Sequence, residues 1–386
     1  MSQSMLYFDY AAATPMDARV VSAMMPYLTD AFFNPSSPYA PALEVRQDYE
    51  QAKGMIARCL GVTADELIMT AGATESINLA IGSFTGHAIC PAVEHDSVLN
   101  AVKKKSHTII GVSETGRLNL DELQMAITDE TTIVSVALAN HELGTMQPIS
   151  DVAKIIHDVR QARLESGNQT PLYLHCDASQ GFGLADVKPS RLGVDMLTLN
   201  AAKIYGPKQV GLLWVSPGIV IEPAMVGGGQ ERGLRSGTEN VAGVIGFSEA
   251  AQLADKKRKG EVKRLGDLRD ILQKTLTESL PSSVVSGDKH RRLANFLHIS
   301  FPSIDAERLV FMLEIEKMYV ATGSACAANK ATRSHVLDAI GLAPEVADGS
   351  LRITLGRQTT EGDIEIAAQK IITAVTKEAT RTGVAL

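Results

Sequence analysis

Short apolar runs alternate with helix-like stretches along the first two thirds of the chain. Within those stretches apolar residues recur every three or four positions, as Val152, Ile156 and Val159 do, which predicts amphipathic helices. Strands that alternate with helices are typical of a mostly parallel sheet covered by helices on both faces. The expected strands are residues 67–69, 88–90, 108–110, 133–138, 172–176, 196–199 and 210–215.

The order of elements changes in the last third of the chain. A long helical pattern begins near Glu239, and we expect it to be broken near Gly260. Because 386 residues exceed the ~250–300 that one core usually supports, we expect two domains, a large α/β domain over 15–250 and a small α+β domain formed by 1–14 and 251–386. The small domain's expected elements are strands at 296–301, 318–321 and 350–355, and helices at 305–314, near Val336 and from Thr360.

Composition and charge exclude several classes of protein. With 45% hydrophobic and 21% charged residues the chain is typical of globular proteins, and no apolar run approaches the ~20 residues that span a bilayer. The first residues lack the pattern of a signal peptide, so we expect a cytoplasmic protein without membrane contact. A net charge of -7 argues against direct binding of nucleic acid, and the basic run at 256–259 is interpreted as a solvated helix face rather than a partner site.

The four cysteines occur singly, which predicts neither a disulfide framework nor a bound metal. Cys59, Cys90 and Cys176 are interpreted as buried small hydrophobic residues. Cys326 lies in a small, polar segment between a predicted strand and a predicted helix, so we expect it on an exposed loop at about 323–333. An exposed thiol on a flexible loop can act as a nucleophile.

A lysine at the end of a predicted strand suggests covalent cofactor chemistry. Lys203 follows the run at 196–199, and Asp177 and Gln180 lie upstream of it. Such a lysine can form a Schiff base with the aldehyde of pyridoxal 5'-phosphate (PLP). The acid would keep the pyridine nitrogen protonated, and the amide would contact the ring oxygen. Taken alone this grouping is weak, because most lysines near strand ends are solvated surface charges.

Two other segments could contribute to such a site. After the strand at 67–69, Gly72 opens a helix whose first N–H groups, at Ala73 and beyond, and whose Thr74 hydroxyl could bind a phosphate. The alternative is a plain glycine turn with a threonine N-cap. His95 also follows a predicted strand and could lie flat on a cofactor ring, although a histidine near a helix start needs no such role.

Arginine and glycine residues add candidate anion contacts. Residues 227–238 combine several glycines with glutamine and arginine, which permits close backbone approach and supplies polar contacts. Arg352 is charged inside a strand-like apolar run, where a carboxylate partner would be natural. That partner could be a substrate or an internal acid.

Taken together, these motifs resemble the cysteine desulfurases, the class V branch of the aminotransferase-like PLP enzymes, over nearly the whole chain. The resemblance implies the type I fold of PLP-dependent transferases, with a mostly parallel sheet flanked by helices and a smaller α+β domain. The matching motifs are Asn-Pro-Ser-Ser at 34–37, Gly-Ala-Thr-Glu-Ser at 72–76, Glu-His at 94–95, Asn-x-Glu-Leu-Gly at 140–144, Lys-Ile-Tyr-Gly-Pro-Lys at 203–208, the glycine-rich segment at 227–238 and Gly-Ser-Ala-Cys at 323–326.

The resemblance also implies an activity and a role for each matching residue. A homodimer would take sulfur from L-cysteine, leave L-alanine, hold the sulfur as a persulfide on Cys326, and pass it to acceptor or scaffold proteins for iron–sulfur clusters or for thiolation of tRNA and cofactors. Cys326 could also ligate a cluster iron for a time. The resemblance implies that Lys203 forms the Schiff base, that Asp177 pairs with the pyridine nitrogen and that Gln180 contacts the ring oxygen. His95 would stack on the ring and act in acid–base steps, and Thr74 would bind the phosphate. Thr238 would reach the phosphate in the neighbouring subunit, and Arg352 with Asn34 would hold the substrate carboxylate.

Three departures from the family pattern concern the cofactor and the substrate. Asn200, Ala201 and Ala202 stand where the family commonly has serine and histidine donors to the phosphate. His141 replaces an asparagine expected near the cofactor, and the histidine often found after the motif at 34–37 is absent. These changes leave open a selenocysteine lyase or another PLP reaction on this fold, and a non-catalytic scaffold that docks sulfur-carrier proteins.

Overall fold

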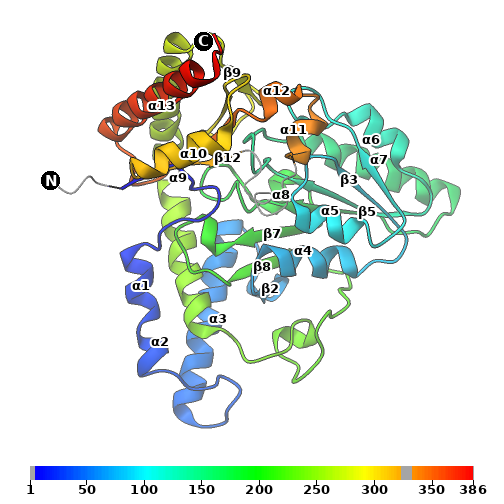
Figure 1. Ribbon diagram of the computed structural model, residues 1–386. Coiled ribbons are helices and arrows are strands. Elements are labelled where there is room, and N and C mark those ends of the chain that lie inside the picture. Colours follow the sequence, from blue (N-terminus) through cyan, green and yellow to red (C-terminus); the bar gives the residue numbers. More distant parts are fainter. Residues whose placement is uncertain (1–4, 323–332, 386) are drawn as a thin grey trace.

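The computed structural model describes residues 5–322 and 333–385 (Figure 1). In this part of the chain seven strands form one large sheet in the order β2-β8-β7-β6-β5-β3-β4. Neighbouring strands are parallel except around β8, which runs antiparallel to both β2 and β7. The strands are β2 (Leu67–Thr70), β3 (His87–Pro91), β4 (His107–Ile110), β5 (Thr131–Ala137), β6 (Tyr173–Asp177), β7 (Met196–Asn200) and β8 (Gly211–Val215).

Four further strands form a smaller antiparallel sheet in the order β12-β13-β10-β9, and β1 pairs with β11 beside it. Its place above the large sheet in Figure 1 fits the change of pattern in the last third of the sequence. The strands are β1 (Leu6–Tyr7), β9 (Val284–Ser286), β10 (Phe296–Ser300), β11 (Met318–Tyr319), β12 (Ala321–Thr322) and β13 (Ser350–Thr354).

Helices begin and end where the local chemistry predicts. At the start of the closing helix, the Thr360 hydroxyl accepts from the Asp363 N–H and the Asp363 carboxylate accepts from the Thr360 N–H. Gly383, in the left-handed conformation, ends the helix. The helices are α1 (Ala18–Met24), α2 (Pro26–Thr29), α3 (Ala40–Leu60), α4 (Ala73–Gly82), α5 (Asp96–Val102), α6 (Leu120–Ala126), α7 (Ile149–Ser166), α8 (Pro189–Leu192), α9 (Val241–Ser279), α10 (Ala306–Ile315), α11 (His335–Ala339), α12 (Pro344–Ala347) and α13 (Glu361–Thr382), with short 3₁₀ turns η1 (Ala64–Glu66), η2 (Ala201–Lys203) and η3 (Glu231–Gly233). Among the described residues, no helix is both long and apolar enough to cross a membrane.

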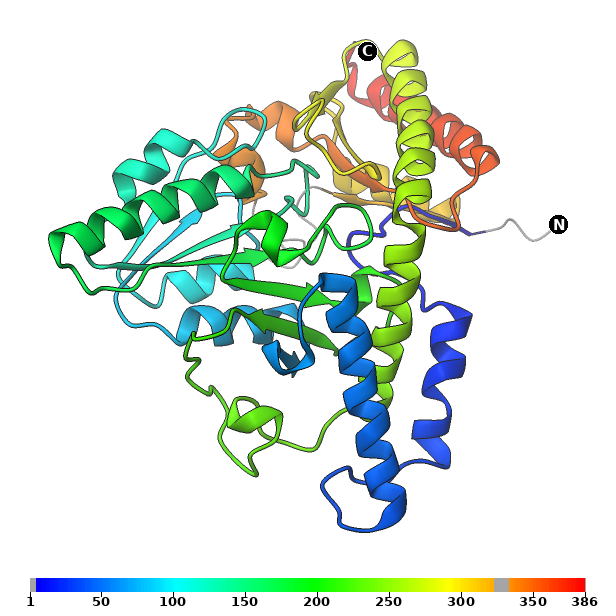
Figure 2. The same ribbon diagram turned by 180° about the vertical axis from the view of Figure 1, so that it is seen from behind.

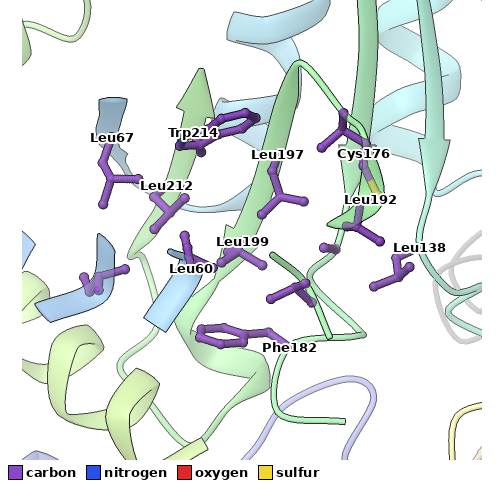
Figure 3. Packing of buried hydrophobic residues seen from close by; sticks show 14 of the residues in the cluster. Leu60, Leu67, Leu138, Cys176, Phe182, Leu192, Leu197, Leu199, Leu212 and Trp214 are labelled. Atoms are coloured by element: carbon purple, nitrogen blue, oxygen red, sulfur yellow. The ribbon is translucent and has the colours of Figure 1, made fainter. Parts of the chain in front are cut away.

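Alternate residues of the large sheet pack against different helices. Leu197 and Leu199 of β7 lie in one apolar cluster with residues of α3, α7 and α9, whereas Met196 packs with α4 and α5 on the opposite face. The same alternation places Leu212 and Trp214 of β8 beside Leu197 and Leu199, as Figure 3 shows. This two-residue period is what a strand buried on both faces requires, and it explains why these runs are almost wholly apolar.

One continuous helix joins the two cores, so the expected break near Gly260 is wrong. The first part of α9 packs in the larger core and its later leucines, from Leu265 onward, pack in the smaller core (Figure 2). A glycine costs a helix only about 1 kcal/mol relative to alanine, and an added Cβ at Gly260 would meet no atom within 4 Å. Burial on both sides outweighs that cost. The domain boundaries at 14/15 and 250/251 stay predictions.

The loop after β5 contacts the small sheet directly at Gly144. Gly144 has a φ of +72°, and a Cβ built there would lie 2.4 Å from Cβ of Phe296, the fully buried first residue of β10. Its carbonyl also accepts from the N–H of Leu293 at 2.9 Å. A side chain at this position would therefore push the two sheets apart.

A buried carboxylic acid joins the end of β3 to β5. Glu94 is 1% exposed, and its Oε1 accepts from the N–H of Ala137 at 2.7 Å, whereas Oε2 has no partner among the described residues. Burial raises the pKa of Glu94 to about 8, the Ala137 N–H opposes the shift, and the charge of Asp177 adds to it. The acid is therefore protonated in the folded protein at neutral pH.

We expect Gly144→Ala to lower the free energy of unfolding by about 2–4 kcal/mol, because left-handed strain adds to the clash with Phe296. Gly167→Ala is the matched control, since Gly167 has a φ of +78° but an added Cβ would meet nothing within 4 Å. That variant should lose only about 1 kcal/mol. Urea-induced unfolding checks both, and equal losses would contradict the close approach.

We expect Glu94→Gln to flatten the pH dependence of stability. The unfolded acid ionises above its ordinary pKa of 4.5, whereas the folded acid stays protonated up to about 8. The wild type therefore loses up to about 1.4 kcal/mol of stability per pH unit as the pH rises through this window, and the amide removes that loss. Urea unfolding at about pH 5.5 and about pH 7.5 measures it. The same pH dependence in both proteins would show that Glu94 is ionised in the fold.

Candidate functional site

Lys203 lies where β7 ends at the edge of the sheet. Asn200 closes the strand, and its Oδ1 accepts from the N–H of Ala202, which starts the 3₁₀ turn η2 that carries the lysine. The Lys203 Nζ donates to the carbonyl oxygens of Ala11 and Ala12, at 2.7 Å each. A segment far away in the sequence thus meets the amine at the carboxyl end of β7.

Asp177 and Gln180 come from the neighbouring strand β6 and the turn after it. The Gln180 Nε2 donates to the Ala11 carbonyl at 3.0 Å, so Gln180 and Lys203 share one acceptor. Asp177 is the last residue of β6, and its Oδ1 accepts from the N–H of Ser179 at 3.0 Å. The predicted amine, acid and amide therefore come from two adjacent strand ends.

His95 reaches the same region from the start of α5. Its Nδ1 accepts from the N–H of Ser97 at 3.1 Å, so the neutral ring carries its hydrogen on Nε2. Burial lowers the pKa of His95, the charge of Asp177 opposes the shift, and that of Lys203 adds to it. The imidazole is therefore neutral at neutral pH and can accept or donate a proton. His95 thus caps a helix, and its interaction with the charges of Asp177 and Lys203 places it near them, while its contact with a cofactor ring stays a prediction.

A cavity of about 600 Å³ opens beside Lys203, and the first turn of α4 forms one wall. Ala73, Thr74 and Asn200 line it together with the lysine, and Gly72 has the left-handed φ of +142° that lets the chain enter the helix. A helix N-terminus turned toward a cavity is suited to bind an anion.

Two residues that the sequence reasoning missed also line this cavity. Lys208 and Gln209 lie on the turn before β8, and Gln209 has a left-handed φ of +59°. Lys208 brings a cation to the wall where Ala202 lacks a polar side chain. Its signal in the sequence was its place at the end of the motif at 203–208.

Arg352 projects from β13 of the small sheet and has an internal carboxylate partner. Its Nη2 donates to Oδ1 of Asp9 at 2.7 Å, and its Nη1 donates to the carbonyl of His141 at 3.0 Å. Its Nε is buried without a hydrogen-bond partner among the described residues. The internal salt bridge considered above is thus present, and it leaves the Nε–H of the guanidinium without an acceptor among the described residues. No role was predicted for Asp9 from the sequence.

His141 lies between His95 and Arg352. Its ring meets that of His95 edge-on with centroids 5.2 Å apart, and burial above all keeps the pKa of His141 well below its ordinary value. The adjacent Glu142 accepts a 2.6 Å hydrogen bond from Ser334, which caps α11. The residue after it, His335, donates from Nε2 to the carbonyl of Glu94 at 2.9 Å. The start of α11 is thus hydrogen-bonded to Glu94, after β3, and to Glu142, after β5. The sequence did not connect this helix with the site.

Asn34 and Thr238 do not join these residues within one chain. Asn34 lies on the loop between α2 and α3, at the far end of those helices from the small sheet that holds Arg352 (Figures 1 and 2). Thr238 is exposed and, in the part of the chain that the structure describes, does not line the cavity beside Lys203.

Cys326 and the predicted loop at 323–333 fall almost wholly outside the described residues, which resume at Arg333. Of the other cysteines, Cys90 and Cys176 are buried and Cys59 is half-buried. Burial raises the pKa of each thiol, to about 11 for Cys59 and further for the other two. These three are therefore poor nucleophiles near neutral pH. Within the described residues, no three His, Cys, Asp or Glu side chains are grouped so as to hold a metal ion.

Comparisons with known proteins identify the family of the chain. The family described as aminotransferase class V matches residues 6–366. A cysteine desulfurase IscS 1 of Archaeoglobus fulgidus is 39% identical over 374 residues, covering 94% of each chain. A cysteine desulfurase IscS of Dictyoglomus turgidum is 38% identical over 371 residues, covering 93% of this chain and 91% of that one.

Solved structures agree as well. A NifS-like protein superposes with a TM-score of 0.88 at 31% identity, covering 97% of this chain and all of the other. A NifS-like protein from Rickettsia africae gives 0.87 at 29% identity with the same coverage. A relative that is 39% identical matches nearly the whole chain, and the family matches residues 6–366. The chain therefore belongs to the cysteine desulfurases of the class V aminotransferase family, whose members depend on PLP.

Proposed function

We propose that this chain holds PLP at Lys203 and uses it to move the sulfur of L-cysteine onto Cys326. The observation that carries the proposal is the convergence of Lys203 and Gln180 on the carbonyl of Ala11, with Asp177 and His95 close enough that their charges interact. This set matches what the cofactor needs: an amine for its aldehyde, an acid for its ring nitrogen and an imidazole for its ring.

The cavity wall fits the phosphate of the same cofactor. The first turn of α4 offers the N–H groups of Ala73 and Thr74 and the hydroxyl of Thr74, which is exposed. Asn200 is engaged in capping η2, and Ala202 offers no side-chain donor. Lys208 on the same wall supports phosphate binding by its charge, which offsets the side-chain donor lost at 202.

Arg352 and His141 would orient the substrate. The unpartnered Nε of Arg352 supports a role in binding the carboxylate of L-cysteine, while Asp9 holds the other side of the guanidinium. His141, neutral and buried, would contact the cofactor without adding a charge that competes for the carboxylate. The charge of the substrate is then neutralised by one fixed arginine.

The chain's own residues would move the protons. When bound, the protonated ring of the cofactor withdraws electrons from Cα of the substrate and makes the proton on that carbon removable. The amine of Lys203 is the group that we expect to take this proton, and the neutral ring of His95 can accept one from the substrate thiol or donate one.

The sulfur transfer itself would then need only a thiolate. The Sγ of Cys326 attacks the substrate sulfur, the bond from Cβ to that sulfur breaks, and its electron pair stays on Cβ. Protonation of Cβ gives the methyl group of alanine, while the sulfur stays on Cys326 as a persulfide. The raised pKa values of the other three thiols support Cys326 as the nucleophile.

A second copy of the chain would complete the site. Asn34 and Thr238 are exposed and lie apart from the residues that they were predicted to assist. Large apolar side chains around the Asn34 loop are also exposed, which supports burial of this end of the molecule in a homodimer. They are Met25, Leu28, Phe32, Tyr39 and Leu43.

An acceptor or scaffold protein would then receive the persulfide sulfur in the cytoplasm. The reactions that consume it, cluster assembly or thiolation of tRNA or a cofactor, need sulfur delivered in a bound form rather than as free sulfide. A cysteine that carries and releases sulfur must leave the site in each cycle, and this requirement supports the placement of Cys326 on a loop.

We expect the purified protein to release alanine and sulfide in equal amounts from L-cysteine in the presence of PLP and a reductant. Cys326→Ser should abolish both products and Cys59→Ser should leave them unchanged, because the Cys59 thiol is protonated at neutral pH. Lys203→Ala should abolish turnover without unfolding the protein. Alanine quantification measures all four proteins. A wild type that gains no visible absorbance on titration with PLP would favour a non-catalytic scaffold, and release that survives Cys326→Ser would favour another lyase.

We expect Arg352→Ala to raise KM for L-cysteine and lower kcat/KM roughly 30- to 1000-fold, the equivalent of about 2–4 kcal/mol of lost carboxylate binding. The matched control is Arg308→Ala, which removes an arginine of the small domain that pairs with Glu378 and lies outside the site. Steady-state kinetics with L-cysteine separate the two variants. An unchanged KM in the Arg352 variant would show that the carboxylate binds elsewhere.

A further inference from the structure

The glycine-rich arm, residues 227–238, is fixed to the large sheet by a buried carboxylate. Glu231 is 9% exposed, and its Oε2 accepts from the Lys53 ammonium at 3.0 Å and from the N–H of Met69 at 2.9 Å. Its Oε1 accepts from the hydroxyl of Tyr49. Three donors from two elements therefore hold one carboxylate, which is what a buried charge requires.

These donors come from the outer edge of the large sheet. Met69 lies in β2, the edge strand, and Glu231 takes up an N–H that β2 does not use in pairing with β8. Tyr49 and Lys53 lie one turn apart on α3, and both are at least nine-tenths buried. Burial, together with the charge of Glu231, raises the pKa of Tyr49, so its hydroxyl stays a donor. The arm is thus attached both to α3 and to the edge strand of the large sheet.

The backbone at this attachment is strained. Glu231 has a φ of +45° and Arg232 a φ of +60°, and neither residue is a glycine. Left-handed backbone costs an ordinary residue about 1–2 kcal/mol, so two such residues in succession persist only where surrounding contacts compel them. The contacts of the Glu231 carboxylate are strong enough to do so, because each involves a charged group. The direction in which the chain leaves residue 232 is therefore set by Glu231.

A second attachment fixes the far end of the arm. The Arg235 Nε donates to Oε1 of Glu75 at 2.9 Å, and Oε2 of Glu75 accepts from the N–H of Ala71 at 2.6 Å. Within the arm, Oε1 of Gln230 accepts from the N–H of Gly237 at 2.9 Å. Figures 1 and 2 both show the arm extending beyond β2, away from the small sheet. Just after these contacts Thr238 is exposed.

We propose that Glu231 is a positioning residue, whose buried carboxylate fixes the glycine-rich arm so that its Thr238 reaches the cofactor phosphate of the second subunit. The inference rests on the proposed function, in which two copies share their sites. It adds that the precision of each cofactor site depends on a carboxylate buried in the other subunit. A role confined to folding would instead affect the subunit that carries the substitution.

Mixed dimers separate these two roles. We expect the Glu231→Ala homodimer to bind PLP more weakly and to turn over L-cysteine roughly 10- to 100-fold more slowly, because a misplaced contact costs about that much. A dimer that pairs one Glu231→Ala chain with one Lys203→Ala chain contains one site with an intact lysine and an intact arm. Such a dimer, isolated with two different affinity tags, should recover about half of the wild-type alanine production.

The outcomes distinguish the two proposals. If the mixed dimer stays as slow as the Glu231→Ala homodimer, Glu231 acts within its own subunit and the inference is overturned. The control pairs Thr238→Ala with Lys203→Ala, and it should recover about half of the wild-type activity as well. If that control does not recover, the proposed sharing of sites between subunits falls, and the role of Glu231 with it.

Two variants that disturb the carboxylate less than Glu231→Ala test the same role with less risk of misfolding. Removing Glu231 leaves the Lys53 charge buried without a partner, which can cost about 3–5 kcal/mol. Tyr49→Phe removes one donor and keeps the ion pair, and Glu231→Gln keeps an acceptor for the Met69 N–H. We expect both to fold, to weaken the absorbance change on PLP titration less than Glu231→Ala does, and to recover in the same mixed dimers. Normal PLP titration in both would contradict the inference.

Discussion

The segment from Phe8 to Thr14 fastens the two sheets to each other at the site. On one side the Ala11 N–H donates to the hydroxyl of Thr354 in β13, at 3.0 Å. On the other side the Thr14 hydroxyl donates to the carbonyl of Ala202, next to Lys203, at 2.9 Å. Between these contacts, the carbonyl oxygens of Ala11 and Ala12 accept hydrogen bonds from the Lys203 amine. Together with α9 and the contact of Gly144 with Phe296, this segment holds Lys203 and Arg352 in one frame.

Charge at the site is arranged by burial as much as by pairing. His95 and His141 are kept neutral because desolvation disfavours the imidazolium, and the nearby charges of Lys203 and Arg352 act in the same direction. Glu94, behind them, is also neutral. The fixed charges that remain are few and belong to groups with defined partners. In the proposed function, the substrate carboxylate would meet Arg352, while Lys203 and Lys208 belong to the cavity proposed for the cofactor.

Much of the fold could be read from the sequence because its signals are local. The runs at 196–199 and 210–215 are apolar because β7 and β8 are covered on both faces. The start of α13 is marked by the capping box that begins at Thr360. The break predicted near Gly260 was wrong because the low helix propensity of one glycine is outweighed when the segments of α9 on both sides are buried. No role was predicted for Asp9, since its partner Arg352 lies far along the chain and pairing at that separation leaves no periodic pattern in the sequence.

The structure brings together the candidate site residues that stand at or just after strand ends, but not those on projecting loops. Asp177 ends β6, Lys203 and His95 follow β7 and β3, and the topology of a parallel sheet brings such ends to one edge. Asn34 and Thr238 lie on loops, and among residues 5–322 and 333–385 neither of them lines the cavity. Glu231 and Arg232 keep their left-handed backbone because contacts within the chain hold the Glu231 carboxylate. In the proposed dimer, this fixed turn would set where the exposed Thr238 meets the second subunit.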